Sequence, residues 1–199
     1  MKSGSLCGSE INTDNIRYRL EEYSGPALSL PPGRPFRAAS VLIPLACDRD
    51  QWNLLYTRRT EHVQNHKGQV SFPGASAESE DVNREATALR ETCEEVGISE
   101  KDIEVLGCLW EMPTISGFLI TPVIGRIPWP VELRLAPEEV SRAFLVPLRW
   151  LADPANHEEV ELNLPDGRHE KVVYFNPFLG EKIWGATARI TLNFLRAIE

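Results

Sequence analysis

The sequence predicts an α+β fold in which helices pack on a mixed β-sheet. The predicted elements follow one another as a hairpin, a helix, several further strands and a last helix, and not as a regular βαβ repeat. The chain has 199 residues, 42% hydrophobic and 25% charged, which suits one well-packed globular core and at most a small appendage. No internal repeat or low-complexity tract argues for another architecture.

The N-terminal part is expected to lie outside the main domain. Residues 1–10 are small and polar, which is typical of a disordered or tag-like segment. A short helix capped by Thr13-Asp14 is predicted to run to about Tyr23. The four prolines of residues 25–35 exclude a continuing helix and indicate a linker arm.

We therefore divide the chain into an N-terminal extension, residues 1–35, and a main domain, residues 36–199. Strands of the main domain are predicted from apolar and β-branched runs at residues 38–46, 53–58, 69–72, 103–110, 118–127 and 140–146. A turn at residues 47–50 joins the first two strands in a hairpin. A late hairpin is predicted at 160–164 and 171–174, around Pro165-Asp166-Gly167.

Two longer helices complete the predicted domain. The central helix begins at an N-cap formed by Asp81 or Asn83 and ends at Gly97, which suits a left-handed C′ position. A helical turn is expected at residues 147–151. An amphipathic helix is predicted at residues 185–198.

Charge and composition exclude several classes of function. The net charge of −8 and the absence of a long Lys/Arg cluster argue against a nucleic-acid partner. No apolar run is long enough to span a membrane and the N-terminus lacks a secretory signal pattern, so a cytoplasmic protein without a membrane partner is predicted. The four cysteines lack zinc spacing and are expected to be isolated, mostly buried thiols.

The segment Arg-Glu-Thr-Cys-Glu-Glu-Val-Gly-Ile, residues 90–98, carries the strongest chemical signal. On a helix, Glu91, Glu94 and Glu95 share one face, where like charges repel one another, and they lie near the C-terminal end that disfavours anions. A divalent cation would offset both costs, and all-oxygen ligands favour Mg²⁺ or Mn²⁺. A solvated acidic helix face is the competing interpretation. Arg90 could pair with Glu94 or orient a ligating carboxylate.

A tight loop, Gly-Gln-Val-Ser-Phe-Pro-Gly at residues 68–74, leads toward this helix. Gly74 can adopt a backbone conformation that turns a carbonyl inward, which could add a neutral oxygen ligand to the same metal.

Residues 74–98 resemble the box that defines the Nudix hydrolases, Gly-x5-Glu-x7-Arg-Glu-U-x-Glu-Glu-x-Gly-U, where U is aliphatic. The matching positions are Arg90, Glu91, Glu94, Glu95, Gly97 and Ile98. Thr92 occupies an aliphatic slot, and Ala75 stands where many members have a second glycine. The spacing from the loop to Arg90 is one residue longer than usual, with Asp81 near the usual glutamate.

That longer spacing resembles the coenzyme A pyrophosphatase branch of the family. Residues 54–60, 66–74, 114–125 and 183–188 are similar to other segments of that branch, in the same order. Gln64 departs from the branch signature, which has an arginine there, and Arg142 is a possible basic-for-acidic difference.

The resemblance implies a Nudix α/β/α sandwich with a mixed central β-sheet, the box helix on one side and the C-terminal helix on the other. It also implies Glu91, Glu95 and Glu94 as metal ligands, with a carbonyl of Gly74 or Ala75. Glu94 and Arg90 are assigned to the catalytic group, Arg90 as the residue that orients a ligating glutamate. The general base is assigned to Glu139 first and Glu138 second, although both also fit ordinary loop carboxylates.

Substrate contacts are expected from five further residues. Arg59 and His66, with Lys67, could contact substrate phosphates, and a solvated loop is the alternative. Ser116 and Phe118 could line the pocket, although Phe118 also suits the core. Trp184 is expected to pack the last helix on the sheet rather than contact a ligand.

The expected activity is hydrolysis of a diphosphate bond in a small nucleotide derivative, first of all coenzyme A or acyl-CoA. The departures at Gln64 and Ala75 leave open another substrate, such as ADP-ribose. A catalytically silent Nudix scaffold is the third hypothesis. A homodimer also stays open as a partner, because the proline-rich arm and the late hairpin have no assigned contacts.

Overall fold

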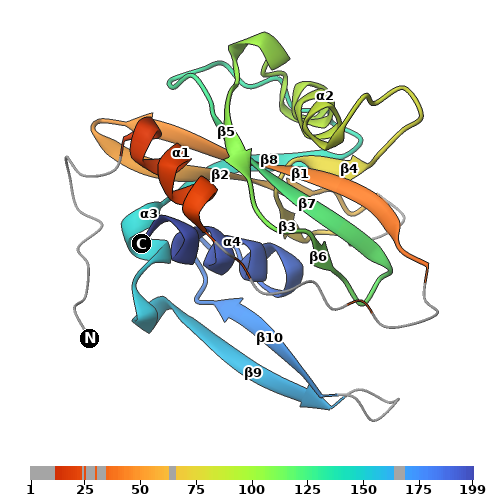
Figure 1. The fold of residues 1–199 in the computed structure, drawn as a ribbon, viewed down its shortest axis with the longest axis vertical. Coiled ribbons are helices and arrows are strands. Elements are labelled where there is room, and N and C mark those ends of the chain that lie inside the picture. Colours follow the sequence, from red (N-terminus) through yellow and green to blue (C-terminus); the bar gives the residue numbers. More distant parts are fainter. Residues whose placement is uncertain (1–11, 24, 26–29, 31–34, 63–65, 164–168) are drawn as a thin grey trace.

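The computed structural model describes residues 12–23, 25, 30, 35–62, 66–163 and 169–199, and its centre is a mixed β-sheet between helices (Figure 1). Helix α2 (Arg84–Val96) covers one face of the sheet. Helices α4 (Gly185–Ile198) and α1 (Thr13–Glu22) lie on the other face. The predicted α/β/α sandwich, with a mixed sheet between the box helix and the C-terminal helix, is confirmed.

The eight-stranded sheet has β1 near its centre and follows the order β3-β2-β1-β7-β5, with β4 on β1, β6 on β7 and β8 on β2. Strands β1 and β7 are parallel, and the other pairs are antiparallel. The strands are β1 (Arg37–Asp48), β2 (Gln51–Arg59), β3 (Val70–Ser71), β4 (Gly74–Ser76), β5 (Glu104–Cys108), β6 (Met112–Pro113), β7 (Phe118–Arg126) and β8 (Val140–Pro147).

A separate hairpin of β9 (His157–Asn163) and β10 (His169–Phe175) packs against α4 through β10 (Figure 1). The short helices are η1 (Glu100–Asp102), α3 (Leu148–Leu151) and η2 (Pro154–Asn156).

The alternation of side chains along β1 and β2 divides the core in two. Leu42 and Leu55 face α2, whereas Leu45 and Tyr56 face α4. Tyr56 is fully buried, and its hydroxyl shares a 2.8 Å hydrogen bond with Thr191 of α4. Because both faces of these strands are covered by helices, the middle of each strand is a run of apolar residues, at 41–46 in β1 and 54–56 in β2.

The helix boundaries largely follow the predicted caps. Asn83 is the N-cap of α2, since its side chain accepts a 2.8 Å hydrogen bond from the amide of Ala86. Gly97 ends the helix in the left-handed conformation, at φ 76°. Asp81, the alternative cap, pairs with Arg90 instead. Helix α1 is capped by Asn12 rather than by Thr13-Asp14.

The division of the chain at residue 36 stays a prediction. Helix α1 is nevertheless attached to the main core, because Ile16 and Leu20 are buried within it. The segment 1–10, expected to be disordered, and the predicted turn at residues 165–167 lie outside the described residues.

Several strand predictions needed correction. The first hairpin is longer than expected and turns at Arg49 and Asp50, which both have positive φ. Strands β4 and β6 were not predicted, because strands of two or three residues carry too little periodicity to be recognised. The strand expected at residues 69–72 is only Val70–Ser71, and the strand expected at 103–110 is Glu104–Cys108.

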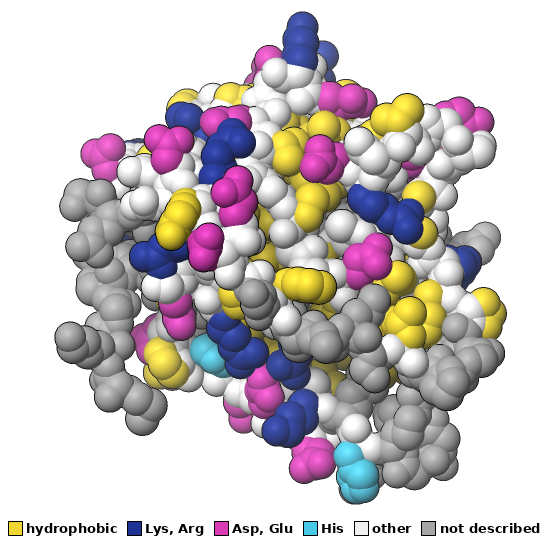
Figure 2. Space-filling model, in the orientation of Figure 1, with side chains coloured by type: hydrophobic (Ala, Val, Ile, Leu, Met, Phe, Trp, Pro, Cys, Tyr) yellow, Lys and Arg dark blue, Asp and Glu magenta, His cyan; other side chains and the backbone are white. Residues whose placement is uncertain are grey.

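On the face that Figure 2 shows, acidic and basic side chains are interspersed. No helix in the described part of the chain is both long and apolar enough to cross a bilayer. Cys47, Cys93 and Cys108 are unpaired thiols, as expected, but Cys93 and Cys108 are exposed, so the expected burial was wrong for them.

Candidate active site

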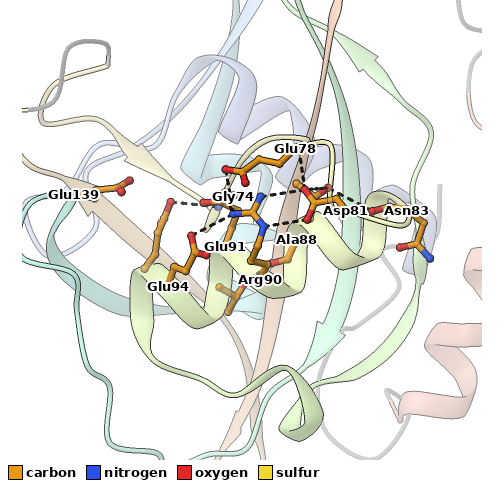
Figure 3. A network of polar contacts seen from close by, with 12 residues as sticks. Gly74, Glu78, Asp81, Asn83, Ala88, Arg90, Glu91, Glu94 and Glu139 are labelled. Atoms are coloured by element: carbon orange, nitrogen blue, oxygen red, sulfur yellow. Dashed lines mark hydrogen bonds and ion pairs between the residues drawn. The ribbon is translucent and has the colours of Figure 1, made fainter.

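Helix α2 presents its acidic residues beside the short strand β4 (Figure 3). Ala88 and Val96 anchor the helix on the sheet, which places the three glutamates at different depths. Glu91 and Glu95 are 7% and 2% exposed, whereas Glu94 is exposed to solvent. The competing interpretation of a fully solvated acidic face is therefore wrong for two of the three carboxylates.

Glu95 is the most deeply buried of these carboxylates. Its Oε1 accepts a long hydrogen bond of 3.4 Å from the amide of Gly74 and lies 3.8 Å from Nη1 of Arg59. Its Oε2 is buried without a hydrogen-bond partner. Burial raises the pKa of Glu95 to about 8, although Arg59 and the Gly74 amide act in the opposite direction, and Glu91 and Glu139 raise it further.

Arg90 contacts three acidic side chains, those of Asp81, Glu91 and Glu94 (Figure 3). Its Nε and Nη2 each lie 3.0 Å from an oxygen of Asp81, in a two-pronged ion pair. Its Nη1 donates to Glu91 at 2.6 Å and to Glu94 at 3.2 Å. The Arg90 guanidinium keeps the pKa of Asp81 well below its usual range. Arg90 thus links Asp81 to Glu91 and Glu94, and Asp81 fixes it in place.

We expect Asp81→Asn to lower the free energy of unfolding by about 1–3 kcal/mol, because it weakens a half-buried, charge-assisted pair. The depressed pKa of Asp81 means that its contribution is present above pH 4 and is lost as the pH falls through the folded-state pKa. Urea unfolding at pH 7 and at pH 3 would measure this. Glu78→Gln is the matched control, since Glu78 lies 3.8 Å from Arg90 and is mostly exposed. Equal losses in the two variants would contradict the role of Asp81.

The residues around Glu95 fit a hard divalent cation. The partnerless Oε2 of Glu95 offers a buried anionic oxygen, and Glu91 lies one helical turn away. Burial, more than the neighbouring charges, raises the pKa of Glu91 as well. Among the described residues, no three His, Cys, Asp or Glu side chains are already arranged as a metal site, and the Glu91 carboxylate is turned toward Arg90. A cation bound between Glu91 and Glu95 would offset the repulsion of their carboxylates and draw the two groups together.

Glu139 belongs to the loop before β8 and faces the same region from the other side (Figure 3). Its carboxylate lies 3.8 Å from Nη2 of Arg59, so Arg59 stands between Glu95 and Glu139. The backbone of this loop is fixed by Thr60, whose amide donates to the carbonyl of Glu139 and whose hydroxyl donates to that of Glu138. Glu138 itself is exposed and does not line the cavity described next.

A cavity of about 1000 Å³ extends from Arg59 and Glu139 between the sheet and the start of α4. Its apolar walls include Val41, Ile120 and Ile190. Four of the five expected substrate residues line it, namely Arg59, His66, Ser116 and Phe118, together with Gly74 and Ala75. Lys67 is not among the lining residues.

The individual lining residues differ from their expected roles in detail. The ring of Phe118 is half-buried and carries the guanidinium of Arg37 4.3 Å from its centroid, so it is a wall residue rather than core. His66 pairs with Gln69 at 2.9 Å. Trp184 stacks on Tyr174 of β10, with ring centroids 6.0 Å apart, and it also lines the cavity. It therefore has a packing role, as expected, but against the late hairpin.

Sequence reasoning missed two cationic residues of the cavity, Lys171 of β10 and Arg189 of α4. Arg189 is held by Glu159 at 2.8 Å and by the carbonyl of Lys171 at 2.9 Å. No motif marks these residues, and only the packing of the late hairpin on α4 brings them to the cavity.

Comparison with known proteins places this geometry in context. The family model of the NUDIX domain matches residues 36–166. An uncharacterized Nudix hydrolase, NudL, of Photorhabdus laumondii is 38% identical over 163 residues, 82% of this chain and 86% of the relative. NudL of Yersinia pestis is 37% identical over 82% of this chain and 80% of its own length. A MutT/nudix family protein from Enterococcus faecalis shares the fold, with a TM-score of 0.53 at 14% identity, over 96% of this chain and 75% of that one.

Proposed function

The chain belongs to the Nudix hydrolase family and is an enzyme that splits diphosphate bonds, and we propose that its substrate is coenzyme A or an acyl-CoA. The products would be 3′,5′-ADP and phosphopantetheine or its acyl form. The observation that carries this proposal is the 1000 Å³ cavity, whose polar end holds Arg59 and Glu139 and whose walls are largely apolar. Such a cavity suits a ligand that continues from a diphosphate into a long, uncharged arm.

Glu91, Glu95 and Glu94, with a carbonyl of Gly74, are the proposed holders of Mg²⁺ or Mn²⁺. Bound there, such an ion would neutralise charge on the diphosphate oxygens and favour ionisation of water. Arg90 keeps Glu91 and Glu94 oriented through the contacts described above. Arg59, between Glu95 and Glu139, would add positive charge next to the diphosphate.

Glu139 is the proposed general base. Attack of water on phosphorus requires that a proton be removed from the water, and the half-exposed carboxylate of Glu139 faces the polar end of the cavity. Glu138, the second candidate, lies outside the cavity lining, which supports Glu139. His66, Ser116 and Phe118 would contact the substrate from the cavity wall.

Gln64, whose departure from the branch signature motivates another substrate, lies outside the described residues. Ala75 lines the cavity without closing it. ADP-ribose or another nucleoside diphosphate derivative therefore remains the alternative substrate, and a silent binding scaffold the alternative role. The cytoplasmic location and the homodimer stay predictions.

We expect the purified protein with Mg²⁺ or Mn²⁺ to release 3′,5′-ADP from coenzyme A, and to do so with a higher kcat/KM than it shows toward ADP-ribose. Chromatographic separation of the products would measure both reactions. Glu139→Gln should lower kcat by roughly a hundredfold with little change in KM if Glu139 is the base. Turnover of ADP-ribose alone would replace the substrate proposal, and no turnover of either would favour the scaffold.

A further inference from the structure

A second cavity, of about 710 Å³, lies beside the first, and Arg59 lines both of them. Its basic lining residues are Arg58, Arg142 and His62, besides Arg59. The acidic ones are Glu61 and Glu181. A cavity with this excess of arginine is unexpected on a chain with a net charge of −8, whose average surface repels anions.

Arg58 and Arg142 are directly opposite each other on the antiparallel strands β2 and β8. Two like charges in this cross-strand position destabilise a sheet unless something compensates for them. The compensating group is Glu181, which follows β10 and is 5% exposed. One of its oxygens lies 3.0 Å from Nη1 of Arg142 and the other 3.4 Å from Nη1 of Arg58.

One buried carboxylate cannot neutralise two guanidinium groups. The side chains of Arg58 and Arg142 are 40% and 44% exposed, so donors of both remain accessible from the cavity. The other acidic neighbour, Glu61, is 68% exposed and lies 3.6 Å from Nη2 of Arg58, which makes it a weak, solvent-screened partner. Glu181 therefore holds two arginines side by side and leaves a net positive charge.

The two arginines are also held in place by other contacts. The guanidinium of Arg142 lies over the ring of Phe144, 5.5 Å from its centroid. The hydroxyl of Ser141 donates to the backbone carbonyl of Arg58 at 3.0 Å. Paired, preorganised guanidinium groups suit a phosphate group, because their planar forks match its oxygens in two-pronged hydrogen bonds.

We propose that Arg58 and Arg142 bind a phosphomonoester carried by the same ligand whose diphosphate lies at the first cavity. Because Arg59 lines both cavities, we take one nucleotide to extend from the first cavity into the second. This inference rests on the proposed function only in taking the ligand to be a nucleotide with an additional phosphate, which in coenzyme A is the 3′-phosphate of the ribose. The subsite would distinguish phosphorylated from dephosphorylated forms of such a nucleotide.

Calorimetric titration with 3′,5′-ADP and with 5′-AMP tests the subsite, because these nucleotides differ by one phosphomonoester. The titrations are made without divalent metal and need no turnover. We expect the intact protein to bind 3′,5′-ADP roughly tenfold more tightly than 5′-AMP, and Arg142→Gln to bring the two affinities together. Arg58→Gln should act in the same way, and Arg142→Lys should keep part of the preference. Arg126→Gln is the matched control, since Arg126 is a half-exposed arginine paired only loosely with Glu104, at 3.5 Å.

Equal affinities of the intact protein for the two nucleotides, or a preference that survives both Arg142→Gln and Arg58→Gln, would overturn the proposal. A titration with inorganic phosphate alone distinguishes the source of the anion. Arg142-dependent phosphate binding without any preference for 3′,5′-ADP would indicate a site for a free anion and would also overturn it. The preference for 3′,5′-ADP without hydrolysis of coenzyme A would support the subsite and reject only the proposed function.

Discussion

Glu95→Gln is expected to lower metal-dependent kcat by at least about a hundredfold and, in the absence of divalent cations, to raise the melting temperature of the protein above pH 8. The two effects have the same origin. A carboxylate that is 2% exposed, with one oxygen unpartnered, is unfavourable for the folded chain on its own and favourable only when a cation accepts its charge.

The sign of the pH dependence follows from the pKa of Glu95. Burial raises this pKa from 4.5 to about 8, so between these values the folded protein keeps a proton that the unfolded chain releases. The free energy of unfolding of the metal-free protein should therefore fall as the pH rises through this window. Glutamine carries no charge and removes this contribution, so the difference between variant and parent should grow from pH 5 to pH 8.5.

Melting curves with EDTA and with Mg²⁺ or Mn²⁺ would test both effects. The metal should raise the melting temperature of the parent protein and have little effect on Glu95→Gln. Glu94→Gln is the matched control for the metal-free measurement, because Glu94 is on the same helix face but its side chain is 59% exposed. A Glu95→Gln protein that melts below its parent in EDTA at pH 8.5 would contradict the assignment of Glu95 as a strained buried ligand.

Features that depend only on residues close together in the chain could be predicted from the sequence alone. The N-cap at Asn83, the left-handed end at Gly97 and the face shared by Glu91 and Glu95 all depend on residues within one helix. The central strands could be predicted because β1, which is buried on both faces, contains a long apolar run and β2 a shorter one. Their order in the sheet and the parallel pairing of β1 with β7 do not follow from the residues of any one strand, since pairing is a property of the whole chain.

Contacts between distant segments could not be predicted in this way. Arg90 was expected to pair with Glu94 or to orient a ligating carboxylate, and it does contact Glu94 and Glu91. Its two-pronged partner is Asp81, which reaches it from the loop before the helix and was not predicted. In the sequence, Arg142 stands out only as an unusual basic residue. Its place in a pair of arginines held by one carboxylate depends on Arg58 and Glu181, which are far from it in sequence and close in space. Such partnerships depend on sheet register and hairpin docking, for which single-sequence patterns carry no signal.

Gly74→Ala is expected to lower the free energy of unfolding by about 2–4 kcal/mol and to abolish most activity in the fraction that folds. Gly74 has φ 150°, a conformation that residues with a side chain rarely adopt. A Cβ atom there would lie 2.3 Å from the carbonyl oxygen of Ser40 and 2.6 Å from Cα of Val41. Both neighbours are backbone atoms of β1, so they cannot move aside as the end of a flexible side chain could.

The consequence reaches the active site because Gly74 pairs with Val41 in the sheet and also donates its amide to Glu95. If β4 moves away from β1 to admit the methyl group, this amide and the proposed carbonyl ligand move with it. Gly180→Ala separates the cost of the backbone conformation from the cost of the close contact with β1. Gly180 also has positive φ, at 81°, but a Cβ there would meet nothing within 4 Å. The control should cost only about 1 kcal/mol in guanidinium unfolding and leave kcat unchanged. Equal losses of stability in both variants would mean that backbone conformation, and not the close contact of β4 with β1, accounts for the glycine.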